Sequence, residues 1–159
     1  MKKLLSICSF LLSLSAFADP INSSNEVYYA QQCAKALPGT KALACAGVRT
    51  SNDSYHVQQC AKVLSEKKAI ACRGVKSIDD AYFVQKCVDA LGDLRAIACV
   101  GVKSIDDSYH VGTCANALSD LKAVACAGVK SSKEAYHVGQ CAAGLEDAKA
   151  SACGITLDI

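Results

Sequence analysis

Long apolar stretches are scarce in this sequence, and the single extended one lies at its start. It runs from Leu4 to Phe17, which is too short to span a bilayer as a helix. Lys2 and Lys3 precede it, and Ala16-Phe17-Ala18 forms a small-x-small cleavage site. We therefore predict a cleaved signal peptide at residues 1–18. The mature chain is expected to be exported to the periplasm, the cell surface or the medium, without insertion into a membrane.

A net charge of either sign is also lacking once the signal peptide is removed. The 17 basic residues of the sequence include Lys2 and Lys3, whereas the 15 acidic residues all lie in the mature chain. The mature chain is therefore close to neutral, which removes the bulk electrostatic attraction that favours nucleic acid or an anionic membrane surface. We expect no nucleic-acid partner.

Close cysteine pairs of the C-x2-C kind, which structural zinc sites favour, are absent from the sequence. Without Cys8 of the signal peptide, ten cysteines remain, and their separations alternate strictly between 12 and 15 residues. An even, high cysteine count in an exported chain predicts disulfides formed in an oxidising compartment. The ten are Cys33, Cys45, Cys60, Cys72, Cys87, Cys99, Cys114, Cys126, Cys141 and Cys153.

The cysteine spacing defines a repeat of 27 residues, which occurs five times and fills most of the mature chain. The heptapeptide GVKSIDD at residues 74–80 recurs unchanged at residues 101–107, one period later. A fixed period of this size is typical of stacked repeat arrays. We predict a single repeat domain at residues 19–159, with repeats at about 23–49, 50–76, 77–103, 104–130 and 131–159.

Each repeat carries the signals of a helical hairpin. A Ser or Thr followed three residues later by Asp or Glu resembles a capping box and should open a first helix of about 13 residues. The shorter Asp side chains are expected to act mainly through the helix dipole. After a tight break, an Ala-rich second helix ends at Gly47, Gly74, Gly101 or Gly128. The caps pair Ser23 with Glu26, Thr50 with Asp53, Ser77 with Asp80, Ser104 with Asp107 and Ser131 with Glu134.

Helix geometry favours pairing of the cysteines that lie 12 residues apart. In the first repeat, Cys33 and Cys45 each lie six residues from the turn, so both are roughly 9 Å from it on antiparallel helices. Facing cysteines at equal height can meet disulfide geometry. A bridge from Cys45 to Cys60 would instead have to join heights that differ by about 13 Å. We predict the bridges 33–45, 60–72, 87–99, 114–126 and 141–153.

These signals predict an all-α fold, a short solenoid of five disulfide-stapled two-helix hairpins. The architecture of residues 23–153 resembles disulfide-stapled helical-hairpin repeats of the Sel1-like and TPR-like kind. The resemblance implies protein–protein interaction as the function. It concerns the architecture alone, because the Sel1 unit is longer and its cysteines are more closely spaced.

Two columns of the repeat are candidates for a binding face. The first holds tyrosine in all copies and lies opposite the inward stripe of the first helix, where rigid amphipathic rings suit an extended partner. Packing of each ring on the preceding Gly-Val junction is the alternative. The second column is basic in all copies and suits an acidic polymer or protein, or else forms a solvated face balanced by acids. The columns are Tyr28, Tyr55, Tyr82, Tyr109 and Tyr136, and Lys41, Lys68, Arg95, Lys122 and Lys149.

Residues with catalytic or metal-binding chemistry form no complete site in the sequence. His56, His110 and His137 share one column with two aromatic residues, and only the last two occupy neighbouring repeats, without a third ligand. The segments Ser65 to Lys68 and Ser119 to Lys122 match the S-x-x-K motif of penicillin-recognising enzymes, but no S-D-N or K-T-G motif accompanies them. Helix capping by serine explains the match better.

We therefore predict a non-enzymatic exported scaffold, without a cofactor or metal, that binds a protein or an extended polymer. One alternative is a weak cell-wall or lactam hydrolase that uses Ser65 or Ser119. Another is a thiol or metal-binding protein. The segment after Cys153 departs from the repeat and is apolar. We expect it to cover the flank of the last repeat or to mediate self-association through Ile155–Ile159.

Overall fold

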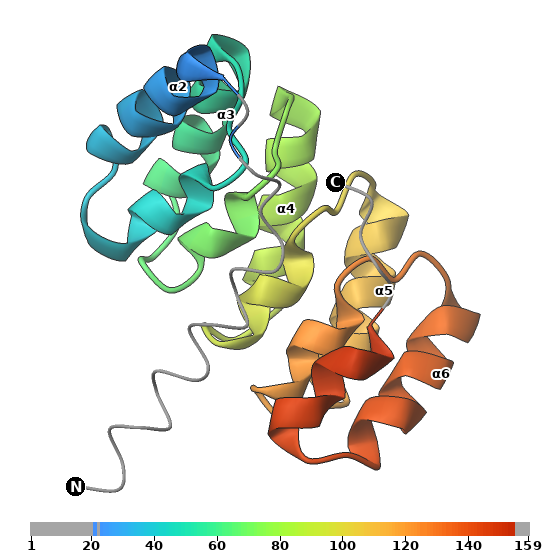
Figure 1. Cartoon of the computed structure of the whole chain (residues 1–159). Helices are drawn as coiled ribbons and strands as arrows, with labels where there is room; N and C mark the ends of the chain where they lie inside the picture. Colours follow the sequence, from blue (N-terminus) through green and yellow to red (C-terminus); the bar gives the residue numbers. More distant parts are fainter. Residues whose placement is uncertain (1–20, 22, 155–159) are drawn as a thin grey trace, which may run out of the picture.

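A computed structural model describes residue 21 and residues 23–154, which form a row of helices in chain order (Figure 1). The predicted signal peptide and the segment Ile155–Ile159 lie outside the described residues. Within the described part, each repeat contributes one α-helix and one 3-10 helix. The all-α class and the repeated hairpin are thus confirmed.

The first helix of each repeat is an α-helix of 12 residues that begins directly after the predicted hydroxyl cap. In all five, the Ser or Thr oxygen accepts a hydrogen bond from the backbone N–H three residues later, at 3.0 to 3.2 Å. This satisfies a donor that would otherwise be unpaired at the helix start. The helices are α2 (Ser24–Lys35), α3 (Ser51–Lys62), α4 (Ile78–Asp89), α5 (Ile105–Asn116) and α6 (Ser132–Ala143).

The capping acids do more than interact with the helix dipole. Asp53 accepts from the backbone N–H of Thr50 at 3.2 Å, which completes a capping box. In the next three repeats the carboxylate accepts instead from the residue before the cap, at 2.7 to 3.2 Å. Even the short Asp side chain reaches this donor, so the expectation of a mainly dipolar role was incomplete. The later donors are the backbone N–H groups of Lys76, Lys103 and Lys130.

The second helix of each repeat is a 3-10 helix, whereas its Ala-rich sequence gave no sign of the tighter winding. A 3-10 helix rises about 2.0 Å per residue against about 1.5 Å in an α-helix, so a short segment covers the return path of the hairpin. Four of these segments end at a glycine with φ between 77° and 85°, as predicted, because such a conformation favours glycine. The elements are η2 (Gly39–Cys45), η3 (Ala69–Cys72), η4 (Arg95–Cys99), η5 (Lys122–Cys126) and η6 (Asp147–Cys153).

Five disulfides join the two helices of each repeat, and they connect the cysteines that lie 12 residues apart, as predicted. The bridged Cα atoms are 5.7 to 5.8 Å apart, within the usual range for a disulfide. The first cysteine of repeats one to four is at most 2% exposed, because the next repeat covers it. Cys141 of the last repeat is exposed, and its partner Cys153 is half-buried.

The repeats stack so that α-helices pack on α-helices and 3-10 helices on 3-10 helices, in two layers (Figure 1). The core between the layers consists of disulfides, alanines and small branched residues such as Val57, Val84 and Val111. Small side chains let the two layers approach closely, but each repeat then buries little apolar area by itself. Stability therefore depends on the disulfides and on contacts between neighbours.

Candidate functional site

The five predicted tyrosines lie on the α-helical layer and point largely into solvent. Between 52% and 69% of each residue is exposed, which leaves most of each ring free of the preceding Gly-Val junction. Each ring stands edge-on against the aromatic or histidine ring of the following residue, with centroids 5.3 to 5.6 Å apart. Such pairs restrain the tyrosine rings without covering them. The result is one exposed, restrained ring in every repeat.

The third and fourth repeats add an exposed isoleucine one turn before the tyrosine. Ile78 is 69% exposed and Ile105 is 53% exposed, and they precede Tyr82 and Tyr109 by four residues on the adjacent helices α4 and α5. Residues at this spacing share one face of a helix. We call these four residues the aromatic patch. Sequence reasoning missed the isoleucines, although their spacing from the tyrosines was a readable signal.

The basic column has a structural role that the sequence did not reveal. The Nζ atoms of Lys41, Lys68 and Lys122 donate to carbonyl oxygens at the C-terminal end of the α-helix in the next repeat, at 3.0 to 3.1 Å. The sequence-based view found no helix dipole for these cations because it considered only their own helix. The dipole that they meet belongs to the neighbouring repeat.

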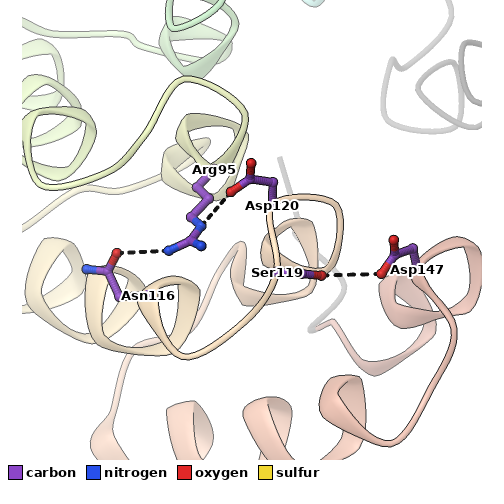
Figure 2. A network of polar contacts seen from close by, with 5 residues as sticks. All are labelled: Arg95, Asn116, Ser119, Asp120 and Asp147. Carbon is purple, nitrogen blue, oxygen red and sulfur yellow. Dashed lines mark hydrogen bonds and ion pairs between the residues drawn. The ribbon is translucent and has the colours of Figure 1, made fainter.

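Arg95 makes the same connection through side chains. Its Nε donates to Asp120 at 2.8 Å, and its Nη1 donates to the Asn116 carbonyl oxygen at 3.4 Å, both in the next repeat (Figure 2). Lys149 belongs to the last repeat and pairs with Glu146 of its own repeat at 3.4 Å, where both side chains are largely exposed. Four of the five basic residues therefore hold repeats together, which weakens the case for a basic binding face.

Replacing Lys122 with methionine should lower the free energy of unfolding by about 1 kcal/mol, since the change removes a cation from the end of α6 while keeping the length of the side chain. Urea unfolding followed by circular dichroism measures this. The control is Lys149→Met, which should change stability by less than about 0.5 kcal/mol because an exposed pair contributes little. Equal losses in the two variants would contradict the inter-repeat role.

The serines of the S-x-x-K segments also connect neighbouring repeats. Ser119 Oγ donates to Asp147 at 3.3 Å (Figure 2), and Ser65 Oγ donates to Asp93 at 3.5 Å, which is a weak contact. The lysines of both segments reach backbone carbonyls of the following repeat. The motif therefore forms a set of stacking contacts here, rather than a serine with a lysine base directed at it.

The histidines do not come together as a metal centre. His110 Nδ1 lies 3.4 Å from Ser132 Oγ, and each histidine packs against the tyrosine before it. Across residues 23–154, no group of three or more His, Cys, Asp or Glu residues is arranged to hold a metal ion. The ten mature cysteines are all paired in disulfides.

Arg73 is a buried cation at the end of η3. It is 7% exposed, and its Nη2 atom has no hydrogen-bond partner within the described part of the chain. Burial lowers the pKa of its guanidinium below the ordinary value, because the charged form loses hydration. The side chain lines a cavity of about 10 Å³ together with Asp80 and Lys103, which is space for roughly one water molecule. Other repeats place Val100 or Ala127 at this position.

Replacing Arg73 with valine, the residue that the third repeat uses, should raise the free energy of unfolding by about 1 kcal/mol, because it removes an incompletely paired buried charge. Thermal unfolding of the purified protein checks this. The matched reverse change, Val100→Arg, should lower the melting temperature. A loss of stability in Arg73→Val would show that the guanidinium makes a net favourable contact in its cavity.

A shallow apolar groove crosses the layer of 3-10 helices, on a different face from the tyrosines. It has a volume of about 150 Å³ and spans the second to fourth repeats. Leu94 and Leu121 are 52% and 40% exposed there. The sequence analysis did not identify this groove, because it forms only when three repeats are stacked. Its lining residues are Lys67, Ile70, Asp93, Leu94, Ile97, Asp120, Leu121 and Val124.

The described helices are too short to traverse a bilayer. Comparisons of the chain with protein-family models, with curated proteins and with solved structures found no match. The resemblance to Sel1-like and TPR-like repeats stays a prediction from the repeat architecture.

Proposed function

We propose that the chain is an exported, non-enzymatic scaffold that binds a protein or an extended polymer through the tyrosines of its α-helical layer. The observation that supports this most is the exposure of one tyrosine in every repeat. The rings lie at a fixed place on successive helices and would contact an elongated partner at regular intervals. The aromatic patch supplies the largest exposed apolar area in this row, and buried aromatic anchors dominate the binding energy of most interfaces.

The disulfides support the exported location. Five bridges in a chain of 159 residues are typical of proteins that fold in an oxidising compartment. The predicted signal peptide at residues 1–18 is consistent with this. A rigid array also suits binding, since a surface that is ordered beforehand loses little conformational entropy when the partner arrives.

The test uses photo-cross-linking in the organism that exports the chain. We would replace Tyr109 with p-benzoylphenylalanine and, as a control, replace Leu43, which is 54% exposed on η2 in the other layer. We expect an adduct on irradiation at position 109 and none at position 43. No adduct at position 109, or equal adducts at both, would contradict a partner on the tyrosine face.

The double change Tyr82→Ala and Tyr109→Ala then measures the energetic contribution. Loss of two central aromatic anchors should weaken binding of the cross-linked partner by at least about tenfold, which corresponds to about 1.4 kcal/mol. The melting temperature should stay within a few degrees of the parent because both rings are exposed. If the double variant unfolds, the tyrosines are structural and the proposal fails.

A further inference from the structure

The apolar groove on the 3-10 layer is open along the described part of the chain, yet its floor is as apolar as a core. Leu94 and Ile97 of η4 and Leu121 and Val124 of η5 form its centre. Exposure of two leucines and two branched side chains in one groove is costly in water. A segment with several apolar side chains would reduce that cost.

The chain itself delivers such a segment close to the groove. Gly154, the last described residue, packs on the fourth repeat so closely that an added Cβ would lie 3.2 Å from the carbonyl oxygen of Ala125. Ala125 is the neighbour of Val124 in η5, and Val124 lines the groove. The five residues that follow Gly154 therefore start beside one edge of the groove.

The length and pattern of these five residues fit the groove. Five residues reach at most about 17 Å when extended, and packed helices lie about 8 to 10 Å apart, so the segment can cross from η5 to η4. Apolar residues occupy alternate positions, Ile155, Leu157 and Ile159. In an extended chain, alternate side chains point to the same side, which would direct all three toward the groove.

Charge also favours this direction of binding. Lys67 lines the end of the groove farthest from Gly154, in the second repeat. The segment ends with Asp158 and the terminal carboxylate, so its negative charge would approach Lys67. By contrast, the free flank of the last repeat exposes mainly small residues, such as Ala143, Gly144 and Ala148, which offer little apolar area to a tail.

We propose that Ile155–Ile159 docks as an extended strand in the apolar groove of the same chain, with Ile155, Leu157 and Ile159 against η5 and η4. This inference is independent of the tyrosine face. It differs from the two sequence-based expectations for this segment, since the tail neither covers the last flank nor joins a second copy.

Cross-linking within the mature chain tests the proposal. p-Benzoylphenylalanine replaces Leu157, and the products are separated by mass before peptide mapping. We expect an adduct within one chain on peptides containing Leu94, Ile97, Leu121 or Val124. The control places the same group at Thr156, whose side chain should point away from the groove and give at least about threefold less adduct. Because the replaced residues lie outside the helical repeats, folding of the array is not at risk.

A second measurement compares amide hydrogen exchange in the full mature chain and in a chain that ends at Gly154. Removal of the tail should speed exchange in η4 and η5 several-fold and leave η2, at the other end of the array, unchanged. Addition of the peptide Gly-Ile-Thr-Leu-Asp-Ile should restore protection in η4 and η5. Adducts on α6 or η6, adducts between two chains, no adduct, or exchange unaffected by truncation would each overturn the proposal.

Discussion

Replacing Cys87 and Cys99 together with alanine should lower the free energy of unfolding by about 3 kcal/mol or more. This bridge closes a loop with a sequence separation of 12 residues, and a loop near this length contributes about 3 kcal/mol through the entropy of the unfolded chain. Both sulfurs are also fully buried in the middle of the array, so alanine leaves unfilled space in the core. Thermal and urea unfolding under non-reducing conditions measure the loss.

The matched control removes the last bridge with Cys141→Ala and Cys153→Ala. Its loop has the same length, so the chain-entropy contribution should be the same. The packing contribution should be smaller, because Cys141 is exposed. The difference between the two double variants therefore isolates the core contribution of a buried disulfide. If the terminal pair costs as much as the central pair, the loop alone accounts for the stabilisation.

Removal of residues 78–104 should yield a folded protein of four repeats. The cut joins Ser77 to Ile105 and regenerates the heptapeptide GVKSIDD, because that sequence occurs one period apart. Contacts between the helices run from each repeat to its neighbour, so the repeats on either side of the cut should stack as the original ones do. We expect four disulfides, an unchanged helix content per residue and a lower melting temperature.

Mass spectrometry after alkylation and circular dichroism measure the outcome. The control deletes α4 alone, residues 78–89, which removes Cys87 and leaves Cys99 without its partner. That shorter deletion should give a free thiol or mispaired disulfides and a loss of helix content. A four-repeat chain that fails to fold, or that pairs cysteines across the new junction, would show that the repeats are not interchangeable units.

Much of the fold could be predicted because its determinants are close in sequence. The hydroxyl caps, the glycine stops and the disulfide partners act within about a dozen residues, where spacing alone constrains geometry. A period of 27 residues then extends one successful local prediction to all five copies. The winding of the second helix was missed, because the packing of the hairpin decides between α and 3-10 geometry.

The candidate site was harder to predict, because its residues act between repeats. Lys122 looked like a free cation until the end of α6 was placed beside it, and Ser119 looked like part of a motif until Asp147 of the next repeat was found opposite. Leu94 and Leu121 are 27 residues apart and form a groove only through stacking. A single repeat viewed alone contains none of this information.

The exposed bridge at the end of the array gives its chemical breakdown a direction. A reducing thiol must reach a sulfur atom to attack a disulfide, so access limits the rate. Cys33, Cys60, Cys87 and Cys114 are shielded by the repeat that follows, whereas Cys141 is open. Reductants should therefore cleave the last bridge first. Unravelling of that repeat would uncover Cys114 in turn, so the array should come apart one hairpin at a time, from its C-terminal end toward α2.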